Sequence, residues 1–186
     1  MLHHLIKGLF LTGLWIFVSP ASAGNVVYSH VEYRDGHYLL QLEMQVRADA
    51  DAVYDVLVDF NYIYTLNDTI KQSKLLESKD KVHKVYIQTE GCIWIFCRAV
   101  RQTQKITEQP DRHLLSETIP EQSDLKFGRT LWHIRERDDE SIISYRADFV
   151  PDFWVPPLIG PWLMKKRLLE EGKKTIYGIE RRATDE

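Results

Sequence analysis

The stretch from Ile70 to Phe149 constrains the fold most, because it contains no good amphipathic helix. It falls instead into runs of strand-like length, which we place at 70–78, 82–91, 94–108, 112–119, 126–137 and 140–150. Turn-like residues such as Lys79-Asp80 and Gly91 separate these runs. Because strands joined by such short connections must be antiparallel neighbours, the stretch predicts an antiparallel meander.

The residues before this stretch predict one strand and two short helices. Residues 25–34 form either a first strand or a loose arm. Apolar and polar residues then alternate along 38–47, which predicts a strand with one buried face. Asp49 or Asp51 caps a short helix, and residues 62–69 form a second short helix or a turn.

The chain ends in one long predicted helix behind a rigid aromatic linker. Prolines at 151, 156 and 157 bar regular strand or helix there, whereas Pro161 is tolerated in a first helical turn. The apolar line that a helical period predicts to be buried consists of Leu158, Trp162, Leu169, Gly172, Ile176 and Ile179. Gly172 either lets the helix approach a sheet closely or leaves space for a guest molecule between helix and sheet.

The order of the predicted elements defines the fold class. One strand, two short helices, an antiparallel meander and a long final helix make an α+β fold. The strand at 38–47 and the six later runs give about seven strands. With 186 residues, 44% of them hydrophobic and 27% charged, the composition favours a single globular domain.

Residues 1–23 have the pattern of a secretory signal peptide. A short basic start is followed by an apolar run from Gly8 to Val18 and by the small-residue ending Ala21-Ser22-Ala23, an A-x-A site. Cleavage after Ala23 leaves one domain at 24–186 and predicts a periplasmic or secreted protein. The apolar run is short for a transmembrane helix, and an uncleaved anchor is the alternative.

Charge excludes one class of partner. Removing residues 1–23 takes away one lysine and no acid, which leaves 23 basic and 27 acidic residues and a net charge of −4. A nucleic-acid partner normally needs a basic surface, so we expect none.

Both cysteines, Cys92 and Cys97, lie in the mature part of the chain. In an exported protein, a pair so placed predicts a local disulfide. The large side chains between them, Trp94, Ile95 and Phe96, form a cavity gate, a membrane-touching tip, or a hairpin packed under a neighbouring element.

Residues 46–60, V-R-A-D-A-D-A-V-Y-D-V-L-V-D-F, and the following Tyr64-Thr65-Leu66-Asn67 carry a family resemblance. They resemble the opening of the START-like (SRPBCC, helix-grip) superfamily, which includes polyketide cyclase/dehydrase-like, coenzyme-Q-binding and lipid-transfer members. Leu66-Asn67 stands where a step with proline is usual. The resemblance in element order covers 36–183. It implies a curved sheet that grips the C-terminal helix, with an apolar cavity between them that holds a lipid-like ligand in many members.

Strand pleating suggests which residues line such a cavity. The apolar faces of 126–137 and 140–150 converge with aromatic residues of the early and final helices if the last helix covers them. The candidate ligand-binding residues are Tyr64, Trp132, Tyr145, Phe149, Trp154, Trp162, Leu169 and Gly172. Aromatic side chains with polar tips suit an apolar guest that carries one or two polar groups. The alternative is that they simply fill the core.

No sequence motif identifies catalytic chemistry. Nucleophile elbows, paired carboxylates, phosphate loops and metal clusters do not stand out, so we predict no catalytic residue, no metal and no cofactor. The run 94–108 has one phase with Arg98 and another with Arg101, and the sequence leaves open which faces inward. Further polar candidates for an inward position are Glu90, Glu117 and Lys165.

Three hypotheses follow from these residues. The first is an exported START-like monomer that binds a hydrophobic small molecule (a lipid, sterol, quinone or polyketide-like compound) and contacts membranes transiently as a carrier. The second is a cyclase/dehydratase-type enzyme that uses the same cavity. The third is a scaffold with a filled core and a protein partner.

Overall fold

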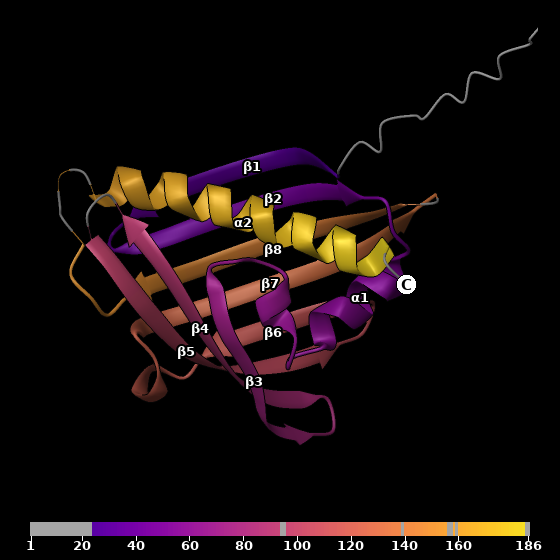
Figure 1. Cartoon of the computed structure of the whole chain (residues 1–186), viewed down its shortest axis with the longest axis horizontal. Helices are drawn as coiled ribbons and strands as arrows, with labels where there is room; N and C mark the ends of the chain where they lie inside the picture. Colours follow the sequence, from indigo (N-terminus) through magenta and orange to yellow (C-terminus); the bar gives the residue numbers. More distant parts are fainter. Residues whose placement is uncertain (1–23, 94–95, 139, 156–157, 159, 185–186) are drawn as a thin grey trace, which may run out of the picture.

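The computed structural model describes residues 24–93, 96–138, 140–155, 158 and 160–184, in which one antiparallel sheet curves around a long helix (Figure 1). The strands are β1 (Asn25–Arg34), β2 (His37–Val46), β3 (Ile70–Lys79), β4 (Val82–Ile93), β5 (Phe96–Gln109), β6 (His113–Thr118), β7 (Leu125–Arg137) and β8 (Glu140–Pro151). The helices are α1 (Ala50–Val58) and α2 (Gly160–Thr184), with the single-turn 3-10 helices η1 (Ile63–Thr65) and η2 (Pro120–Gln122). The α+β class and the long C-terminal helix agree with the sequence prediction.

The strands lie side by side in the order β1-β2-β8-β7-β6-β5-β4-β3. Each consecutive pair from β3 to β8 is antiparallel, which is the predicted meander. β2 pairs with β8, for example Leu42 with Tyr145, so the second and the last strand of the chain lie side by side, next to the edge that β1 forms. This pairing places the strand that precedes α1 next to the strand that precedes α2.

The sheet contains eight strands within the described residues, not about seven. β1 pairs with β2 along its length, with Arg34 opposite His37. The turn between them has positive φ at Asp35 (52°) and Gly36 (87°), the conformation that suits the twist of a two-residue hairpin. Most of β1 is exposed, so its side chains lack the apolar alternation that identifies a strand in the sequence.

Helix α1 begins at a clear cap and packs into the core. The side chain of Asp49 accepts hydrogen bonds from the backbone N–H groups of Asp51 and Ala52, so Asp49 is the N-cap of the two candidates. Val53 and Leu57 are buried on the face of α1 that joins the main hydrophobic cluster. The second expected short helix is the single turn η1.

Helix α2 lies beside β1 and β2 across the inner face of the sheet (Figure 1). Ile176 and Ile179 are buried, as the apolar line predicts. At the other end of that line the prediction is wrong, because Leu158 is 94% exposed and Trp162 is 65% exposed. Leu158 precedes the helix, and the buried residues of the first turns are Gly160 and Met164.

Two glycines let α2 approach its neighbours closely. A Cβ at Gly172 would lie 2.5 Å from Cδ1 of Leu42 on β2. The space beside Gly172 is therefore filled by Leu42, which fits the first of its two interpretations. A Cβ at Gly178 would lie 2.6 Å from the backbone carbonyl carbon of Leu66, so the helix touches the chain directly after η1.

Some sequence expectations concern residues outside the described ranges. They are the signal peptide at 1–23, the side chains of 94–96, and the prolines at 156 and 157. In the part of the chain that the structure describes, none of the helices has the length and apolar character needed to cross a membrane.

Candidate functional site

A pocket of about 670 Å3 lies between the N-terminal half of α2 and the inner face of β4 and β5. α2 contributes Met164 and Leu168 to its wall, and the segment after β8 contributes Phe153, Trp154 and Val155. Small-molecule sites typically have volumes of roughly 300–1,000 Å3. The pocket therefore has the size of a site for a lipid-like or drug-sized molecule.

A second pocket of about 260 Å3 adjoins the first. Val100, Met164 and Leu168 line both, which means that the two spaces share walls. The second pocket extends over β6, β7 and β8, where Tyr145 and Phe149 line it. Together the two pockets follow the inner face of the sheet from β4 to β8.

Strand β5 gives the pockets their polar side chains. Arg98 and Gln102 line the larger pocket, and Gln102 and Gln104 line the smaller one. Because alternate residues of a strand share a face, the phase with Arg98 is the inward one. Arg101 lies in the other phase, where its Nε is 3.2 Å from Oδ2 of Asp124.

A chain of hydrogen bonds lines the smaller pocket. Ser116 Oγ donates to Gln104 Oε1 at 2.6 Å, and Gln104 Nε2 donates to Gln102 Oε1 at 2.7 Å. On the neighbouring strands, Tyr145 is hydrogen-bonded to Thr130, and burial raises the pKa of the Tyr145 hydroxyl to about 12. Tyr145 therefore keeps its proton near neutral pH. The hydroxyl and amide groups of these five residues are neutral, so they can orient a polar part of a ligand but do not act as strong bases.

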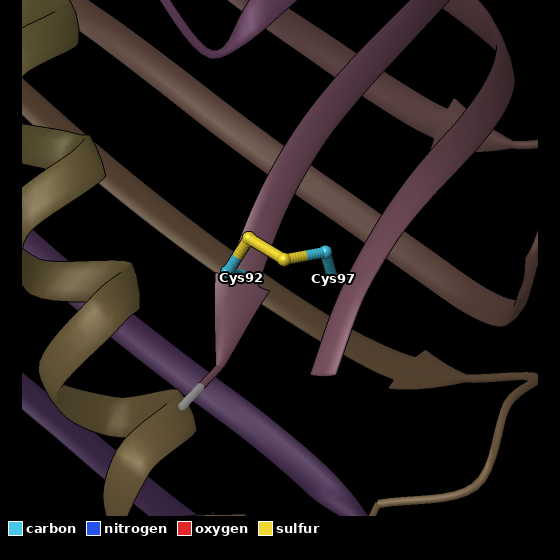
Figure 2. Close-up of a disulfide and its surroundings, with 2 residues drawn as sticks. All are labelled: Cys92 and Cys97. Atoms are coloured by element: carbon cyan, nitrogen blue, oxygen red, sulfur yellow. A yellow bond between two sulfur atoms is a disulfide. The ribbon is translucent and has the colours of Figure 1, made fainter. Parts of the chain in front are cut away.

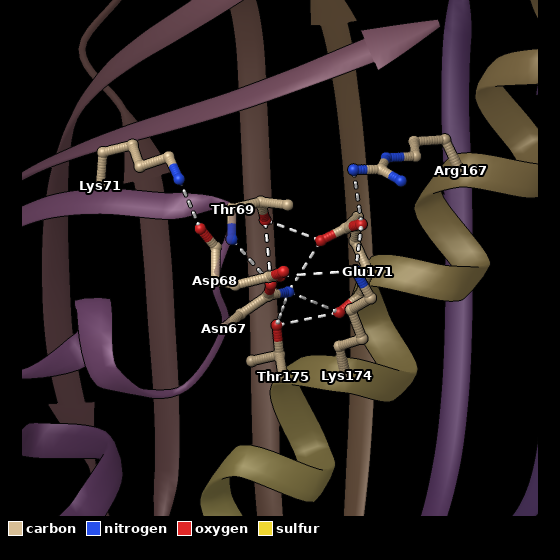
Figure 3. A network of polar contacts seen from close by, with 8 residues as sticks. All are labelled: Asn67, Asp68, Thr69, Lys71, Arg167, Glu171, Lys174 and Thr175. Atoms are coloured by element: carbon tan, nitrogen blue, oxygen red, sulfur yellow. Dashed lines mark hydrogen bonds and ion pairs between the residues drawn. The ribbon is translucent and has the colours of Figure 1, made fainter.

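A polar network links α2 to the loop before β3 at the rim of the larger pocket (Figure 3). Glu171 lies at its centre: Thr69 Oγ1 donates to Glu171 Oε2 at 2.7 Å and Asn67 Nδ2 donates to the same oxygen at 2.9 Å. On the other side, Arg167 Nη2 lies 2.9 Å from Glu171 Oε1. All four residues line the pocket. The network holds the helix against the loop and makes one side of the pocket polar.

The predicted disulfide between Cys92 and Cys97 joins the ends of β4 and β5 (Figure 2). The two cysteines lie opposite each other in the β4–β5 ladder. Cys97 also lines the larger pocket. The disulfide therefore braces the part of the sheet that forms the pocket wall.

Arg98 is the cation of the pocket that remains available to a ligand. Its Cζ lies 4.9 Å from the centroid of the Phe153 ring, a cation–π contact that positions the guanidinium without neutralising it. Within the described residues no carboxylate forms an ion pair with Arg98, whereas Arg167 is paired with Glu171. An anionic group of a ligand could therefore bind at Arg98.

Four of the eight candidate ligand-binding residues lie at or next to the pockets. Tyr145 and Phe149 line the smaller pocket, and Trp154 lines the larger one. Trp132 packs against Tyr145, with ring centroids 4.4 Å apart. Their contact with a ligand stays a prediction.

The structure does not bring the other four to the pockets. Tyr64 is 43% exposed and stacks on Tyr62 outside the sheet, and Trp162 is exposed on α2. Leu169 packs against the hydrophobic core, and Gly172 faces Leu42. None of these four lines either pocket.

Sequence analysis missed most of the polar rim. Asn67, Thr69 and Glu171 come together only through the fold, and the one signal was that Asn67 stands where a proline step is usual in the START-like pattern. Of the acidic and basic candidates, Glu90 lines the larger pocket. Glu117 lies in the outward phase of β6, since the alternate residues Leu114 and Ser116 are buried, and Lys165 does not line either pocket.

A partly buried cluster outside the pockets contains a serine, a histidine and a glutamate. Ser78 Oγ lies 3.0 Å from His83 Nδ1, and His83 Nε2 lies 2.7 Å from Glu108 Oε1. The Tyr54 hydroxyl donates to Glu108 Oε2 at 2.7 Å. Burial alone would raise the pKa of the Glu108 carboxyl, but the hydrogen bonds from Tyr54 and His83 outweigh it and hold that pKa below its usual range. These hydrogen bonds connect α1 to β4 and β5, and none of the four residues lines either pocket.

Among the residues that the structure describes, no group of three or more His, Cys, Asp or Glu side chains is arranged to hold a metal ion.

Comparison with known proteins identifies the fold. The sequence matches no protein-family model, and no curated protein sequence matches it either. Solved structures do match: a START superfamily protein from Mycobacterium smegmatis has a TM-score of 0.63 at 15% identity, over 81% of this chain and 99% of that chain. A STAR-related lipid transfer protein from Xanthomonas axonopodis has a TM-score of 0.61 at 16% identity, over 83% and 98%.

A third similar structure is the Zhui aromatase/cyclase from a Streptomyces species, with a TM-score of 0.59 at 14% identity, over 79% of this chain and 91% of that chain. Lipid transfer proteins and aromatase/cyclases therefore share one architecture with this chain. The protein has a START-like fold of the SRPBCC type. This is the helix-grip architecture that the residues from Val46 to Phe60 imply.

Proposed function

We propose that the protein binds a hydrophobic small molecule between α2 and the sheet and acts as an exported carrier. The observation that supports this most is the pair of adjoining pockets, whose shared wall is formed by Val100, Met164 and Leu168. Removing apolar ligand surface from water there contributes about 25 cal/mol per Å2. The likeness in fold to a STAR-related lipid transfer protein supports the same conclusion.

The polar groups of the pockets define how such a ligand lies. Its apolar body occupies the space between α2 and β5, and its polar or anionic end lies at Arg98. Gln102 and Tyr145 serve a second polar group deeper in the site. Ligands of the lipid, sterol, quinone and polyketide kinds all combine an apolar body with one or two such groups.

Export and release complete the proposal. The sequence pattern of residues 1–23 supports export with cleavage after Ala23, and the Cys92–Cys97 disulfide is typical of oxidising compartments. The carrier works as a monomer in the periplasm or outside the cell, and it contacts a membrane when it loads or releases its ligand. Release requires the segment after β8 or the β4–β5 hairpin to move, because both border the larger pocket.

The test is a titration with cis-parinaric acid, a fluorescent fatty acid, combined with mass spectrometry of lipid extracted from protein purified from its own host. We expect saturable binding by the wild type and a loss of at least about tenfold in affinity in Leu168→Trp, because indole fills the shared wall. The matched control is Tyr177→Trp, at a side chain of α2 that is 41% exposed. Absence of both saturable binding and an extractable apolar molecule would refute the proposal.

The alternative is a cyclase/dehydratase-type enzyme in the same space. The hydrogen-bond chain Ser116–Gln104–Gln102 and the protonated Tyr145 hydroxyl favour it, because they could orient and polarise a carbonyl-rich substrate. Such an enzyme would turn over a polyketone substrate. It would lose turnover in Tyr145→Phe while still binding cis-parinaric acid, an outcome that a pure carrier does not show.

A further inference from the structure

Glu180 carries a buried carboxylate near the C-terminal end of α2 that its neighbours do not fully satisfy. The residue is 9% exposed. The backbone N–H of Gly24 donates to Oε1 at 3.0 Å, and Arg47 Nη2 lies 3.5 Å from the same oxygen. The other oxygen, Oε2, is buried and accepts no hydrogen bond from any described residue.

This environment is poor compensation for a buried negative charge. A single neutral amide donates one hydrogen bond, and the Arg47 side chain is 42% exposed, so water weakens its attraction. A buried carboxylate normally needs a close opposite charge and hydrogen bonds to both oxygens. The atom best placed to supply them is the nitrogen of Gly24 itself.

Position 24 accepts only glycine. A Cβ there would collide with the Glu180 carboxylate and would lie 2.7 Å from the backbone oxygen of Gln45. Gly24 is buried, and its nitrogen points at the Glu180 carboxylate. The sequence independently predicts a cleavage site directly before this residue, at Ala21-Ser22-Ala23.

We propose that Glu180 is a binding site for the new amino terminus that cleavage creates at Gly24. This inference rests on the proposed removal of residues 1–23. Hydrolysis of the Ala23–Gly24 peptide bond consumes one water and leaves a carboxylate on Ala23 and an ammonium on Gly24. The amide with one N–H becomes an ammonium with three, which donates to both oxygens of Glu180 and neutralises its charge.

The consequence is a link between processing and stability. Before cleavage the start of β1 offers Glu180 a neutral amide, and after cleavage it offers a buried ion pair. The mature chain therefore fastens β1 to the last turns of α2 by an ion pair, whereas the precursor has only the hydrogen bond from a neutral amide there. A precursor of lower stability suits a chain that crosses a membrane before it folds.

The pair is tested in vitro with a version of the chain in which residues 1–23 are replaced by a tag that a site-specific protease removes directly before Gly24. Thermal unfolding is measured for the same preparation before and after the cut. We expect the cut to raise the Tm of the wild type by about 5 °C. It should not raise the Tm of Glu180→Gln. Glu170→Gln, the same change at an exposed position of α2, should show the wild-type rise.

Acetylation of the Gly24 amine after the cut provides a measurement that needs no substitution, because an acetyl group restores a neutral amide. It should abolish the gain in Tm. The proposed ion pair would be refuted if cutting does not change the Tm of the wild type. It would also be refuted if the gain in Tm persists after acetylation or in Glu180→Gln.

The processing step is tested separately, by intact mass and N-terminal sequencing of the full-length chain exported by its own host. A mature chain that starts at Gly24 supports the proposal, and any other start refutes it. Binding of cis-parinaric acid is measured on the same samples, so a failure of the ion pair is distinct from a failure of the ligand-binding proposal.

Discussion

Replacing Arg98 with glutamine should weaken the binding of an anionic amphiphile and leave its neutral analogue unaffected. Arg98 projects from the inward phase of β5 into the larger pocket, where its guanidinium lies 4.9 Å from the centre of the Phe153 ring. Asp124 attracts this guanidinium electrostatically, but no described carboxylate forms an ion pair with it. Glutamine keeps a hydrogen-bonding side chain of intermediate length, so the change removes the charge and little else.

The size of the effect follows from the exposure of Arg98. An exposed ion pair contributes about 0.2–1 kcal/mol, and a hydrogen bond to a charged group contributes about 1.5–3 kcal/mol when it is shielded from water. A bound ligand would shield Arg98 on one side, with Phe153 on another. We therefore expect Arg98→Gln to lose binding free energy near the boundary between these ranges, about 1.4 kcal/mol, which is a rise of about tenfold in Kd.

The assay is displacement of cis-parinaric acid by oleic acid and by oleyl alcohol, which differ only in the carboxylate. Arg98→Gln should raise the Kd for oleic acid about tenfold and leave the Kd for oleyl alcohol within about twofold of the wild type. Arg101→Gln is the matched control, because Arg101 lies on the outward face of β5 and pairs with Asp124. Equal losses for acid and alcohol, or equal losses in the two variants, would show that Arg98 does not recognise the anionic end.

Three further predictions concern stability. Gly178→Ala should lower the free energy of unfolding by more than about 2 kcal/mol, because the new Cβ collides with the backbone of Leu66. Gly172→Ala should lower it by less than about 1 kcal/mol, because the new Cβ meets the end of the Leu42 side chain and alanine has the higher helix propensity. Urea unfolding of both variants measures the two losses, and equal losses would contradict this reasoning. Reducing the Cys92–Cys97 disulfide, with a sequence separation of 5, should cost about 2 kcal/mol; a reduced protein of unchanged Tm would argue against it. The pKa of Glu108 is lowered in the folded state from 4.5, so its contribution is present above about pH 4.5 and is lost as pH falls further. Glu108→Gln should therefore be less stable than the wild type at pH 7 and should lose less stability on acidification. Equal losses of stability in the two proteins below pH 4.5 would count against this role of Glu108.

The elements that the sequence predicts well are those with one buried face. The alternation along 38–47 predicts β2, because every second residue of a half-buried strand faces the core and is apolar. The short turns from Lys79 onward predict the meander. For residues 25–34 the sequence leaves a strand and a loose arm open, because both faces of β1 are largely exposed. A strand of that kind is recognisable from its pairing with β2, which only the structure shows.

Contacts between distant segments limited prediction of the site. The helical period predicts Trp162 on the buried line, and the early helices offer Tyr64 as a further aromatic residue of the cavity, yet both are exposed. A helical period gives the direction of a side chain relative to its own helix and not the position of that helix on the sheet. The sequence leaves the inward phase of β5 open because both phases carry polar side chains, for example Arg98 in one and Arg101 in the other.

The two halves of α2 are held in different ways, and this difference locates the route to the pockets. In the C-terminal half, Ile176 and Ile179 are buried in the core. In the N-terminal half, Met164 and Leu168 face the pockets, and Glu171 attaches the middle of the helix to the loop before β3. Because a helix moves as a stiff rod, the end that packs against empty space can tilt at lower cost than the end that packs against side chains. We therefore expect a ligand of the proposed kind to enter at the N-terminal end of α2, between the disulfide-braced end of β4 and β5 and the segment that follows β8.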